Sequence, residues 1–316
     1  MARPTIALIA ERSGYSVATV SRALHNDASV VAETRDHVLR VSRELGYQPS
    51  IAGRRLSWGT KAVVGLSLGA HDHAAGRFVA MMHQALSGQL SKSGWSVELI
   101  AVDDFNGTPE IGGLILVGIA PNDPRLSSPL VRKIPTVAIG HDLDCFCVAA
   151  DDRRGGMLAA EHLLASGRRR LAVLQAAPDG DRPVIRVEAF LTAARAAGHA
   201  PLLITADAGA TPSLQGYRAL LGPLTNKVRF DGLFCETDEL ALGAMAAIED
   251  AGLNVPGDIA IVGFDDLPDL ASRLTTIHQD FPKLAEAAIK LLAEAKRGVA
   301  PRKVLMPIEL VKRQTT

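Results

Sequence analysis

The N-terminal part of the chain repeats apolar residues with the period of an α-helix. An apolar face with i, i+3, i+4 spacing begins at Ile6, and Thr5 directly before it can accept the free amides of a first turn. Residues 13–15 interrupt this pattern, and a second helix is predicted to run to about Leu24. A third helix is predicted over residues 32–45. Because a tight turn between two short helices is typical of a helix-turn-helix, this segment is predicted to be a small helical bundle.

The second predicted helix has an unusual outer face. Ser16 can cap this helix, while Val20 and Leu24 lie one turn apart on its inner side. At 100° per residue Ala18 and Arg22 lie on the opposite side, where an outward arginine suits the reading of guanine in a major groove. The hydroxyl residues beside it that can hold phosphates are Ser16, Thr19 and Ser21. An interaction module with a merely exposed arginine is the alternative.

From residue 62 onward the pattern changes to short apolar segments that alternate with helical ones. The predicted strands are residues 62–68, 97–102, 114–119, 136–139, 171–174, 202–205, 232–235 and 259–263. The predicted helices are residues 77–93, 153–166, 185–197, 214–221, 239–251 and 282–296. This alternation predicts parallel sheets covered by helices.

The composition excludes several classes of protein. The chain has 316 residues, of which 47% are hydrophobic and 22% are charged, so it is neither a disordered nor a fibrous sequence. No apolar run approaches the roughly 20 residues that cross a bilayer, and no basic-then-apolar signal opens the chain. We therefore expect a cytoplasmic protein that has no membrane partner. Three cysteines are too few for a disulfide framework.

The net charge of zero hides an asymmetry along the chain. Residues 1–61 carry nine Lys or Arg against five Asp or Glu, and the remaining residues carry the compensating acidic excess. A basic head joined to an acidic body indicates a polyanionic partner for the head. A solvated helical surface is the plainer interpretation of the same excess.

Three stretches of the head resemble one known family. Residues 5–24 (TIALIAERSGYSVATVSRAL), residues 33–35 (ETR) and residues 44–50 (ELGYQPS) resemble the lactose-repressor/galactose-repressor family of transcriptional regulators. The match continues through almost the whole chain.

The resemblance implies roles for single residues of the head. It implies that Val17, Ala18 and Arg22 read bases, and the two small apolar residues suit contact with thymine methyl groups. The other residues of the head that it assigns to DNA binding are Thr5, Ser16, Thr19 and Ser21.

Residues 50–56 (SIAGRRL) are too short to form a stable isolated helix. They resemble the family's hinge helix, which orders when it pairs with its symmetry mate in the minor groove. In that interpretation Arg54 and Arg55 neutralise phosphates, and Leu56 is the wedge that pries apart a central base step. An ordinary linker that carries arginines is the alternative.

The remaining chain resembles the family's periplasmic-binding-protein-like body, in which two α/β lobes surround a cleft. The expected fold is therefore an N-terminal all-α helix-turn-helix domain followed by a two-lobed α/β periplasmic-binding-protein-like domain. The expected domains are a DNA-binding head over residues 1–48, a hinge helix and linker over residues 49–60, and an effector-binding and dimerisation body over residues 61–316. Residues 103–111 are too few for a normal parallel crossover, so the family's second body helix is expected to be deleted or reduced to a turn.

Ligands of such sheets bind beyond the carboxyl ends of the strands, and three stretches match family motifs there. Arg186 lies in a motif similar to Arg-x-x-Gly-Phe and is the first choice for an effector contact. Thr237 and Asp238 stand where the family usually carries Asn-Asp, and Asp265 lies in a turn similar to Gly-Phe/Tyr-Asp-Asp. Arg and Asp around one cleft suit a hydroxyl-rich effector, such as a sugar or sugar derivative. Helix capping by Asp238 and turn stabilisation by Asp265 are the structural alternatives.

His71 and His73 lie where the family also places cleft residues, so the resemblance implies effector contacts there. The same His-x-His pair has no further ligands at suitable spacing, and we expect neither a metal nor a cofactor.

The resemblance favours a homodimeric repressor of transcription that binds a pseudo-palindromic operator in double-stranded DNA and responds to a small effector. An enzyme of α/β fold is one alternative. The chain contains no dinucleotide-binding Gly-x-Gly-x-x-Gly, no phosphate loop, no Gly-x-Ser-x-Gly and no His-Glu-x-x-His, so no catalytic residue is assigned. A cytoplasmic sugar-binding module without a DNA-binding role is the other alternative.

Overall fold

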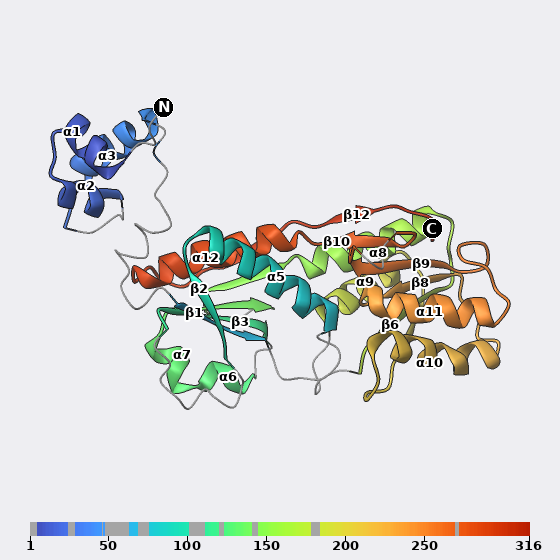
Figure 1. Cartoon of the computed structure of the whole chain (residues 1–316). Helices are drawn as coiled ribbons and strands as arrows, with labels where there is room; N and C mark the ends of the chain where they lie inside the picture. Colours follow the sequence, from blue (N-terminus) through green and yellow to red (C-terminus); the bar gives the residue numbers. More distant parts are fainter. Residues whose placement is uncertain are drawn as a thin grey trace. The chain divides into compact units, whose positions relative to one another are not determined.

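The computed structural model describes residues 5–24, 29–45, 47, 63–68, 76–100, 111–119, 123–140, 145–177, 184–268 and 272–316. Contacts between residues divide the chain into two compact units, Met1–Gly59 and Thr60–Thr316. We call them the head and the body and describe each by itself (Figure 1).

Three helices make up the described part of the head: α1 (Ile6–Ser13), α2 (Val17–Leu24) and α3 (Ala32–Glu44). The predicted caps are confirmed. Thr5 Oγ1 accepts a hydrogen bond from the Leu8 amide at 3.3 Å, and Ser16 Oγ accepts one from the Thr19 amide at 3.1 Å. Gly14 has a φ of 75°, in the left-handed region that favours glycine, so α1 ends there and the chain turns into α2.

The inner faces of the three helices form one core. Ile9, Val20 and Val38 are completely buried, and Leu24 and Leu45 are partly buried against them. Each buried aliphatic side chain contributes roughly 1.5–3 kcal/mol, so a few such residues hold this small unit together. The burial confirms the inner face predicted for α2.

The N-lobe of the body is built on a six-stranded sheet with the order β11-β5-β4-β3-β1-β2. Its strands are β1 (Val63–Leu68), β2 (Ser96–Leu99), β3 (Gly113–Ile119), β4 (Thr136–Gly140), β5 (Cys147–Ala150) and β11 (Lys303–Met306). The helices that pack on it are α5 (Gly76–Lys92), α6 (Pro124–Ser127), α7 (Pro129–Lys133) and α12 (Phe281–Lys296). Gly113 faces Leu292 of α12, whereas the next residue, Leu114, packs with Leu130 of α7. Because successive strand residues point to opposite faces, α12 and α7 cover opposite faces of the sheet.

The C-lobe is built on a second six-stranded sheet with the order β12-β10-β9-β8-β6-β7. Its strands are β6 (Leu171–Gln175), β7 (Leu202–Thr205), β8 (Gly232–Cys235), β9 (Ala260–Asp265), β10 (Thr275–His278) and β12 (Glu309–Val311). Its helices are α8 (Asp152–Ala165), α9 (Ile185–Ala196), α10 (Pro212–Thr225) and α11 (Asp238–Asp250). The pairings are parallel except for the antiparallel pair β10–β12.

Alternate residues of β6 show how the helices cover the C-lobe sheet. Val173 packs with Phe190 of α9, whereas Leu174 packs with Leu240 of α11. The α8–α9 pair and the α10–α11 pair therefore lie on opposite faces. Helices on both faces bury β8 along its whole length, as expected for a parallel sheet.

The chain passes between the two sheets at Ala150–Asp152, at His278–Phe281 and at Met306–Glu309. Helix α12 consequently belongs to the N-lobe although it follows strands of the C-lobe, as the red helix beside α5 in Figure 1 shows. The first two passages bring Asp152 and Gln279 to the border between the lobes.

The predicted fold class is confirmed, and every predicted helix and strand of the body has a counterpart. The elements that sequence reasoning missed are β5, β10, β11, β12, α6 and α7. β5 contains two alanines and β10 begins with two threonines, so neither is a strong apolar run, and alanine is depleted in strands. Helices α6 and α7 have only four and five residues. Most of residues 103–111 lies outside the described part, where the expected loss of a helix is not tested.

Close packing of α8 on α9 leads to the first prediction. A Cβ at Gly156 would lie 2.0 Å from the Arg186 carbonyl oxygen and 2.9 Å from the Phe190 amide nitrogen. Backbone atoms cannot move aside by a rotamer change, so Gly156→Ala should lower the free energy of unfolding by about 1–3 kcal/mol. Gly88→Ala is the matched control, because a Cβ at that helical glycine meets nothing within 4 Å. Urea unfolding of both variants tests this, and equal stabilities would contradict the predicted backbone clash.

Candidate functional site

The outer side of α2 carries the side chains predicted to read bases. Val17 is 52% exposed, and Ala18 and Arg22 are also exposed, whereas Val20 and Ala23 on the inner side are buried. Arg22 Nε donates a hydrogen bond to the Ala18 carbonyl at 3.3 Å, which keeps the arginine stem along the helix. The structure thus brings the three residues together on one accessible face of the second helix of a helix-turn-helix.

The hydroxyl residues of the head have structural roles beside the predicted ones. Ser16 is the cap of α2, and its Oγ lies 2.9 Å from Thr19 Oγ1. Thr5 caps α1, while Ser21 is half-buried on α2. The predicted DNA contacts of Arg54, Arg55 and Leu56 lie outside the described residues.

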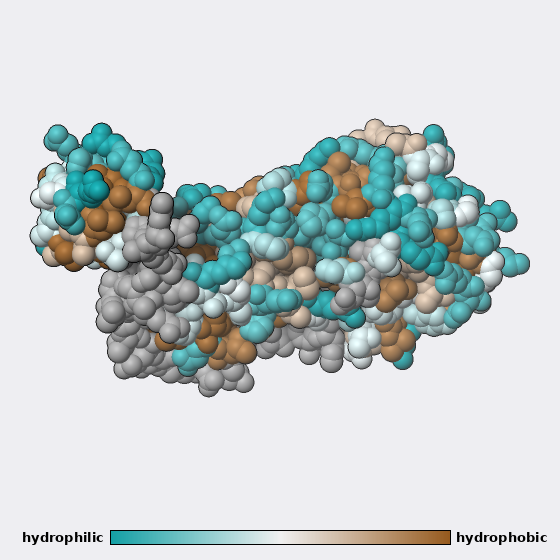
Figure 2. Space-filling view, turned by 45° about the horizontal axis from the view of Figure 1, so that its top comes forward, coloured by the Kyte–Doolittle hydropathy of each residue, from teal (hydrophilic) through white to brown (hydrophobic). Residues whose placement is uncertain are grey.

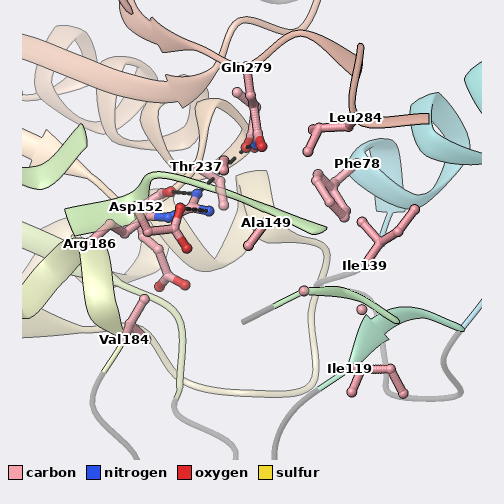
Figure 3. Close-up of a pocket in the computed structure, with 15 residues that line it drawn as sticks. Phe78, Ile119, Ile139, Ala149, Asp152, Val184, Arg186, Thr237, Gln279 and Leu284 are labelled. Carbon is pink, nitrogen blue, oxygen red and sulfur yellow. Dashed lines mark hydrogen bonds and ion pairs between the residues drawn. The ribbon is translucent and has the colours of Figure 1, made fainter. Parts of the chain in front are cut away.

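The body contains a cavity of about 280 Å³ between its two lobes (Figure 3). It lies at the carboxyl ends of β3, β4 and β5 of one sheet and of β8 and β9 of the other, where open α/β sheets bind ligands. The lining residues are Phe78, Gly118, Ile119, Ile139, Gly140, Ala149, Ala150, Asp152, Val184, Arg186, Glu236, Thr237, Asp265, Gln279 and Leu284.

The cavity has one apolar and one polar side. Four apolar side chains come from N-lobe elements and lie in the same half of Figure 3: Phe78, Ile119, Ile139 and Leu284. Val184, at the start of α9, adds an apolar side chain from the C-lobe. The polar and charged ones are Asp152, Arg186, Glu236, Thr237, Asp265 and Gln279. A ligand that fills this space would therefore meet carbon surface from one lobe and hydrogen-bonding groups from the other.

Arg186 is the centre of the polar side. Its Nη2 donates to Asp152 Oδ1 at 2.8 Å, and its Nη1 donates to the backbone carbonyl of Glu236 at 3.0 Å. The Nη1 atom also lies 3.6 Å from Asp265 Oδ1, and the guanidinium stacks 3.6 Å from the centre of the Phe264 ring. Burial alone would lower the pKa of Arg186, but the charges of Asp152, Asp265 and Glu236 outweigh it and raise the pKa above its usual value. Arg186 therefore stays charged.

Asp265 reaches the cavity through an unusual backbone conformation. It is the last residue of β9 and has a φ of 113°, which costs a residue with a side chain on the order of 1–3 kcal/mol. The Gln279 amide donates a hydrogen bond to its Oδ1. Burial raises the pKa of Asp265 well above the usual value, and the nearby charge of Arg186 opposes the rise. The following residue, Asp266, accepts hydrogen bonds from His278 and Arg313 and so holds the turn.

Glu236 and Thr237 occupy the carboxyl end of β8. Glu236 Oε2 accepts a hydrogen bond from the Ala176 amide at 2.8 Å, which fixes its side chain beside the end of β6. Thr237 lines the cavity and is also the cap of α11, since its Oγ1 accepts from the Leu240 amide at 3.2 Å. The capping role that was the alternative for Asp238 is therefore filled by Thr237.

The structure does not support the effector contact that the sequence predicted for Asp238. Its side chain is fully buried and does not line the cavity. Thr276 Oγ1 donates to one carboxyl oxygen at 2.6 Å, and the Leu267 amide donates to the other at 2.8 Å. Asp238 is the first residue of α11, and its side chain points into the sheet, where it anchors the turn that follows β9.

Asp238 leads to a prediction about pH. Burial raises its pKa from 3.8 to about 7, although the hydrogen bonds from Thr276 and Leu267 oppose the rise. The folded protein thus binds a proton at Asp238 more tightly than the unfolded chain does. Protonated Asp238 therefore stabilises the fold fully below a pH of about 4, and this contribution is lost as the pH rises to about 7. The asparagine of Asp238→Asn cannot titrate, whereas the wild type loses stability as Asp238 ionises. The difference in unfolding free energy by which the variant is less stable than the wild type should therefore shrink by about 2 kcal/mol between pH 5 and pH 8. Urea unfolding at both pH values measures this, and a constant deficit would contradict it.

Sequence reasoning missed three polar residues of the cavity: Asp152, Glu236 and Gln279. Asp152 and Gln279 follow β5 and β10, two strands that were not predicted. Glu236 directly follows a predicted strand, and its position alone was a usable signal. His71 and His73 lie outside the described residues.

Within the described part of the chain, no group of three or more His, Cys, Asp or Glu side chains is arranged to hold a metal ion. No described helix combines the length and the apolar character that spanning a membrane requires. In Figure 2 hydrophilic residues cover much of the visible face of the body and enclose smaller hydrophobic patches.

Two family models match the chain. The model described as bacterial regulatory proteins, lacI family, matches residues 5–50, and the model of a periplasmic binding protein-like domain matches residues 160–316. The ribose operon repressor of Halalkalibacterium halodurans is 30% identical over 99% of this chain and 97% of its own length. The transcriptional regulator GntR of Pseudomonas aeruginosa is 32% identical over 99% of this chain and 96% of its own length.

Solved structures show the same fold. A complex of the transcriptional regulator CelR with cellobiose matches 99% of this chain and 100% of that one, with a TM-score of 0.72 and 24% identity. A lac repressor dimer bound to operator and the anti-inducer ONPF matches 99% of both chains, with a TM-score of 0.70 and 24% identity. Because relatives at 30% identity or more match it from end to end, the chain belongs to the lacI family of bacterial regulatory proteins.

Proposed function

We propose that the chain is a sequence-specific DNA-binding repressor of transcription, controlled by a small polar effector in the body cavity. The main support is the outer face of α2, which presents Val17, Ala18 and Arg22 in a family of DNA-binding regulators. In this role Arg22 reads guanine, while Val17 and Ala18 contact thymine methyl groups. The residues proposed to hold the phosphate backbone are Thr5, Ser16, Thr19 and Ser21.

The chain acts as a homodimer in this proposal. Two heads related by a two-fold axis recognise a pseudo-palindromic operator, as the two-fold symmetry of a dimer requires. One matched solved structure is a repressor dimer on its operator. Arg54 and Arg55 then neutralise phosphates and Leu56 wedges a base step in the minor groove. A protein with this role works in the cytoplasm, where its operator DNA is.

The effector in this proposal is a sugar or sugar derivative that bridges the lobes. Relatives include a ribose operon repressor and a regulator in complex with cellobiose. Arg186, Thr237 and Asp265 are the proposed polar contacts, to which the structure adds Asp152, Glu236 and Gln279 as further candidates. His71 and His73 stay proposed contacts on the strength of the family resemblance. Effector binding changes lobe closure, moves the hinge pair and shifts DNA affinity by a coupling of about 1–3 kcal/mol.

An enzyme is disfavoured by the relatives, which are regulators of transcription. Deletion of residues 1–60 distinguishes a repressor from a sugar-binding module that does not bind DNA. Full-length protein and the deletion variant are compared for duplex binding and for stabilisation by sugars. The proposal expects the variant to lose DNA binding and to keep ligand binding. Unchanged DNA binding in the variant would contradict the role given to the head.

A further inference from the structure

A hydrogen bond joins the two lobes beside the cavity. Helix α5 of the N-lobe and helix α11 of the C-lobe both begin there, and Phe78 and Thr237 at their starts line the cavity (Figure 3). Glu239 Oε2 accepts a hydrogen bond from the Arg77 amide at 3.4 Å. Both carboxylate oxygens also face Gly76, where a Cβ would lie 3.4 and 3.6 Å from them. We call this arrangement the interlobe contact, in which a carboxylate of one lobe lies on the first two residues of a helix in the other.

The interlobe contact supplies what the start of α5 lacks. The first amides of a helix have no acceptor within their own helix and carry a partial positive charge. No acidic residue lies in the first turn of α5, so Glu239 of the other lobe brings an anion to it. Glu239 is half-buried, and burial raises its pKa, whereas the amide and the charge of Arg77 oppose the rise. The carboxylate therefore gives up water in this arrangement and recovers a hydrogen bond from α5.

Both members of the interlobe contact are tied to the wall of the cavity. Glu239 directly follows Thr237, which caps α11 and lines the cavity, and Asp238, whose buried carboxyl group is bonded within the C-lobe. Arg77 directly precedes Phe78, which lines the cavity from the N-lobe. An effector that touches both lobes therefore spans the same gap as the interlobe contact. Closing this gap forms both sets of contacts together, and opening it breaks both.

We propose that Glu239 is a positioning residue for the effector, because its contact with the start of α5 holds the lobes closed over the cavity and slows the departure of the bound molecule. A ligand that fits between closed lobes shifts the population toward them, and a bond present only in the closed arrangement adds to that shift. The effector enters while the lobes are apart, so this bond changes its dissociation rate rather than its association rate. This inference rests on the proposed function, because it concerns the control of the same cavity.

Hydrogen exchange tests the interlobe contact without any ligand. The Arg77 amide has its acceptor in the other lobe, so its exchange rate reports the contact directly. In the full-length protein this amide should exchange about tenfold faster in Glu239→Ala than in the wild type. Glu239→Gln keeps an oxygen acceptor but loses the charge, and it should give an intermediate rate. Glu188→Ala removes an acidic residue from the first turn of α9 and should leave the rate unchanged. Equal exchange in the wild type and in Glu239→Ala would overturn the proposal.

Ligand kinetics test the effect on the effector. D-ribose, D-glucose, D-galactose and cellobiose are screened by thermal shift, and the sugar that stabilises the wild type most is the probe. Its dissociation rate should rise about 5- to 10-fold in Glu239→Ala, while its association rate should stay within about twofold. Glu239→Gln, for which a smaller rise is expected, is measured if the alanine variant does not fold. An unchanged dissociation rate would overturn the proposal.

The outcomes separate this inference from the proposed function. The wild type and Glu239→Ala are also assayed for release of a selected duplex by the probe sugar. An unchanged dissociation rate in a protein whose duplex the sugar releases would overturn the inference and leave the repressor role intact. Faster dissociation from Glu239→Ala in a protein without duplex preference would support the inference and contradict the repressor role. A panel without a stabilising sugar would count against a sugar effector, and exchange of the Arg77 amide would then decide the inference by itself.

Discussion

Arg186→Ala is expected to abolish the effector response and to lower the free energy of unfolding of the body by about 3–5 kcal/mol. The guanidinium is the buried partner of Asp152 at 2.8 Å and lies 3.6 Å from Asp265. Its removal leaves these carboxyl groups buried without their cation, which is the costly case for a buried ion pair. Urea unfolding and effector-dependent release of DNA measure the two effects.

A second substitution separates stability from response. Arg186→Ala combined with Asp152→Ala removes both members of the ion pair and should recover part of the lost stability without recovering the response. Arg195→Ala on the exposed side of the same helix is the matched control and should change neither property. Wild-type stability and a full response in the single Arg186 variant would show that this guanidinium does not organise the cavity.

Arg22→Ala is expected to remove operator discrimination and to keep effector binding. A bidentate contact between arginine and guanine contributes about 1–3 kcal/mol of discrimination, so the preference for the operator over a site with that base changed should fall roughly 5- to 150-fold. Titration of both duplexes at fixed salt measures this preference.

The control for this experiment is another exposed arginine of the head. Arg43 on α3 also bonds a backbone carbonyl of its own helix, and Arg43→Ala removes the same charge. It should lower affinity for both duplexes together, if at all, because a phosphate contact carries no sequence information. Equal discrimination before and after the loss of Arg22 would remove it from base reading.

Much of the fold was predictable because its signals are local. Thr5 and Ser16 mark the starts of α1 and α2 by the chemistry of capping. The apolar strands that lie between helices on both faces, such as β8, stand out as buried runs. The antiparallel strand β12 and the short helices α6 and α7 did not stand out, since their positions depend on tertiary packing rather than on their own residues.

The candidate site was predictable only where a strand was recognised. Arg186 and Asp265 follow from motif and strand ends, whereas Asp152 and Gln279 belong to the passages between the sheets, which only the three-dimensional structure brings together. The effector contact predicted for Asp238 was wrong because the side chain of a polar residue at a helix start can point into the protein as well as toward a cavity. Thr276 and Leu267, which hold its carboxyl group, are far from it in sequence.

The central claim is that one chain both recognises a DNA sequence and adjusts that recognition to a small molecule. The most direct measurement is a titration of the purified full-length protein with its best genomic duplex and with a random duplex, with and without a broad panel of metabolites. The account predicts a preference for the genomic duplex that at least one metabolite changes about 5- to 150-fold, the range of ordinary allosteric coupling. Equal affinity for both duplexes under every condition would contradict it.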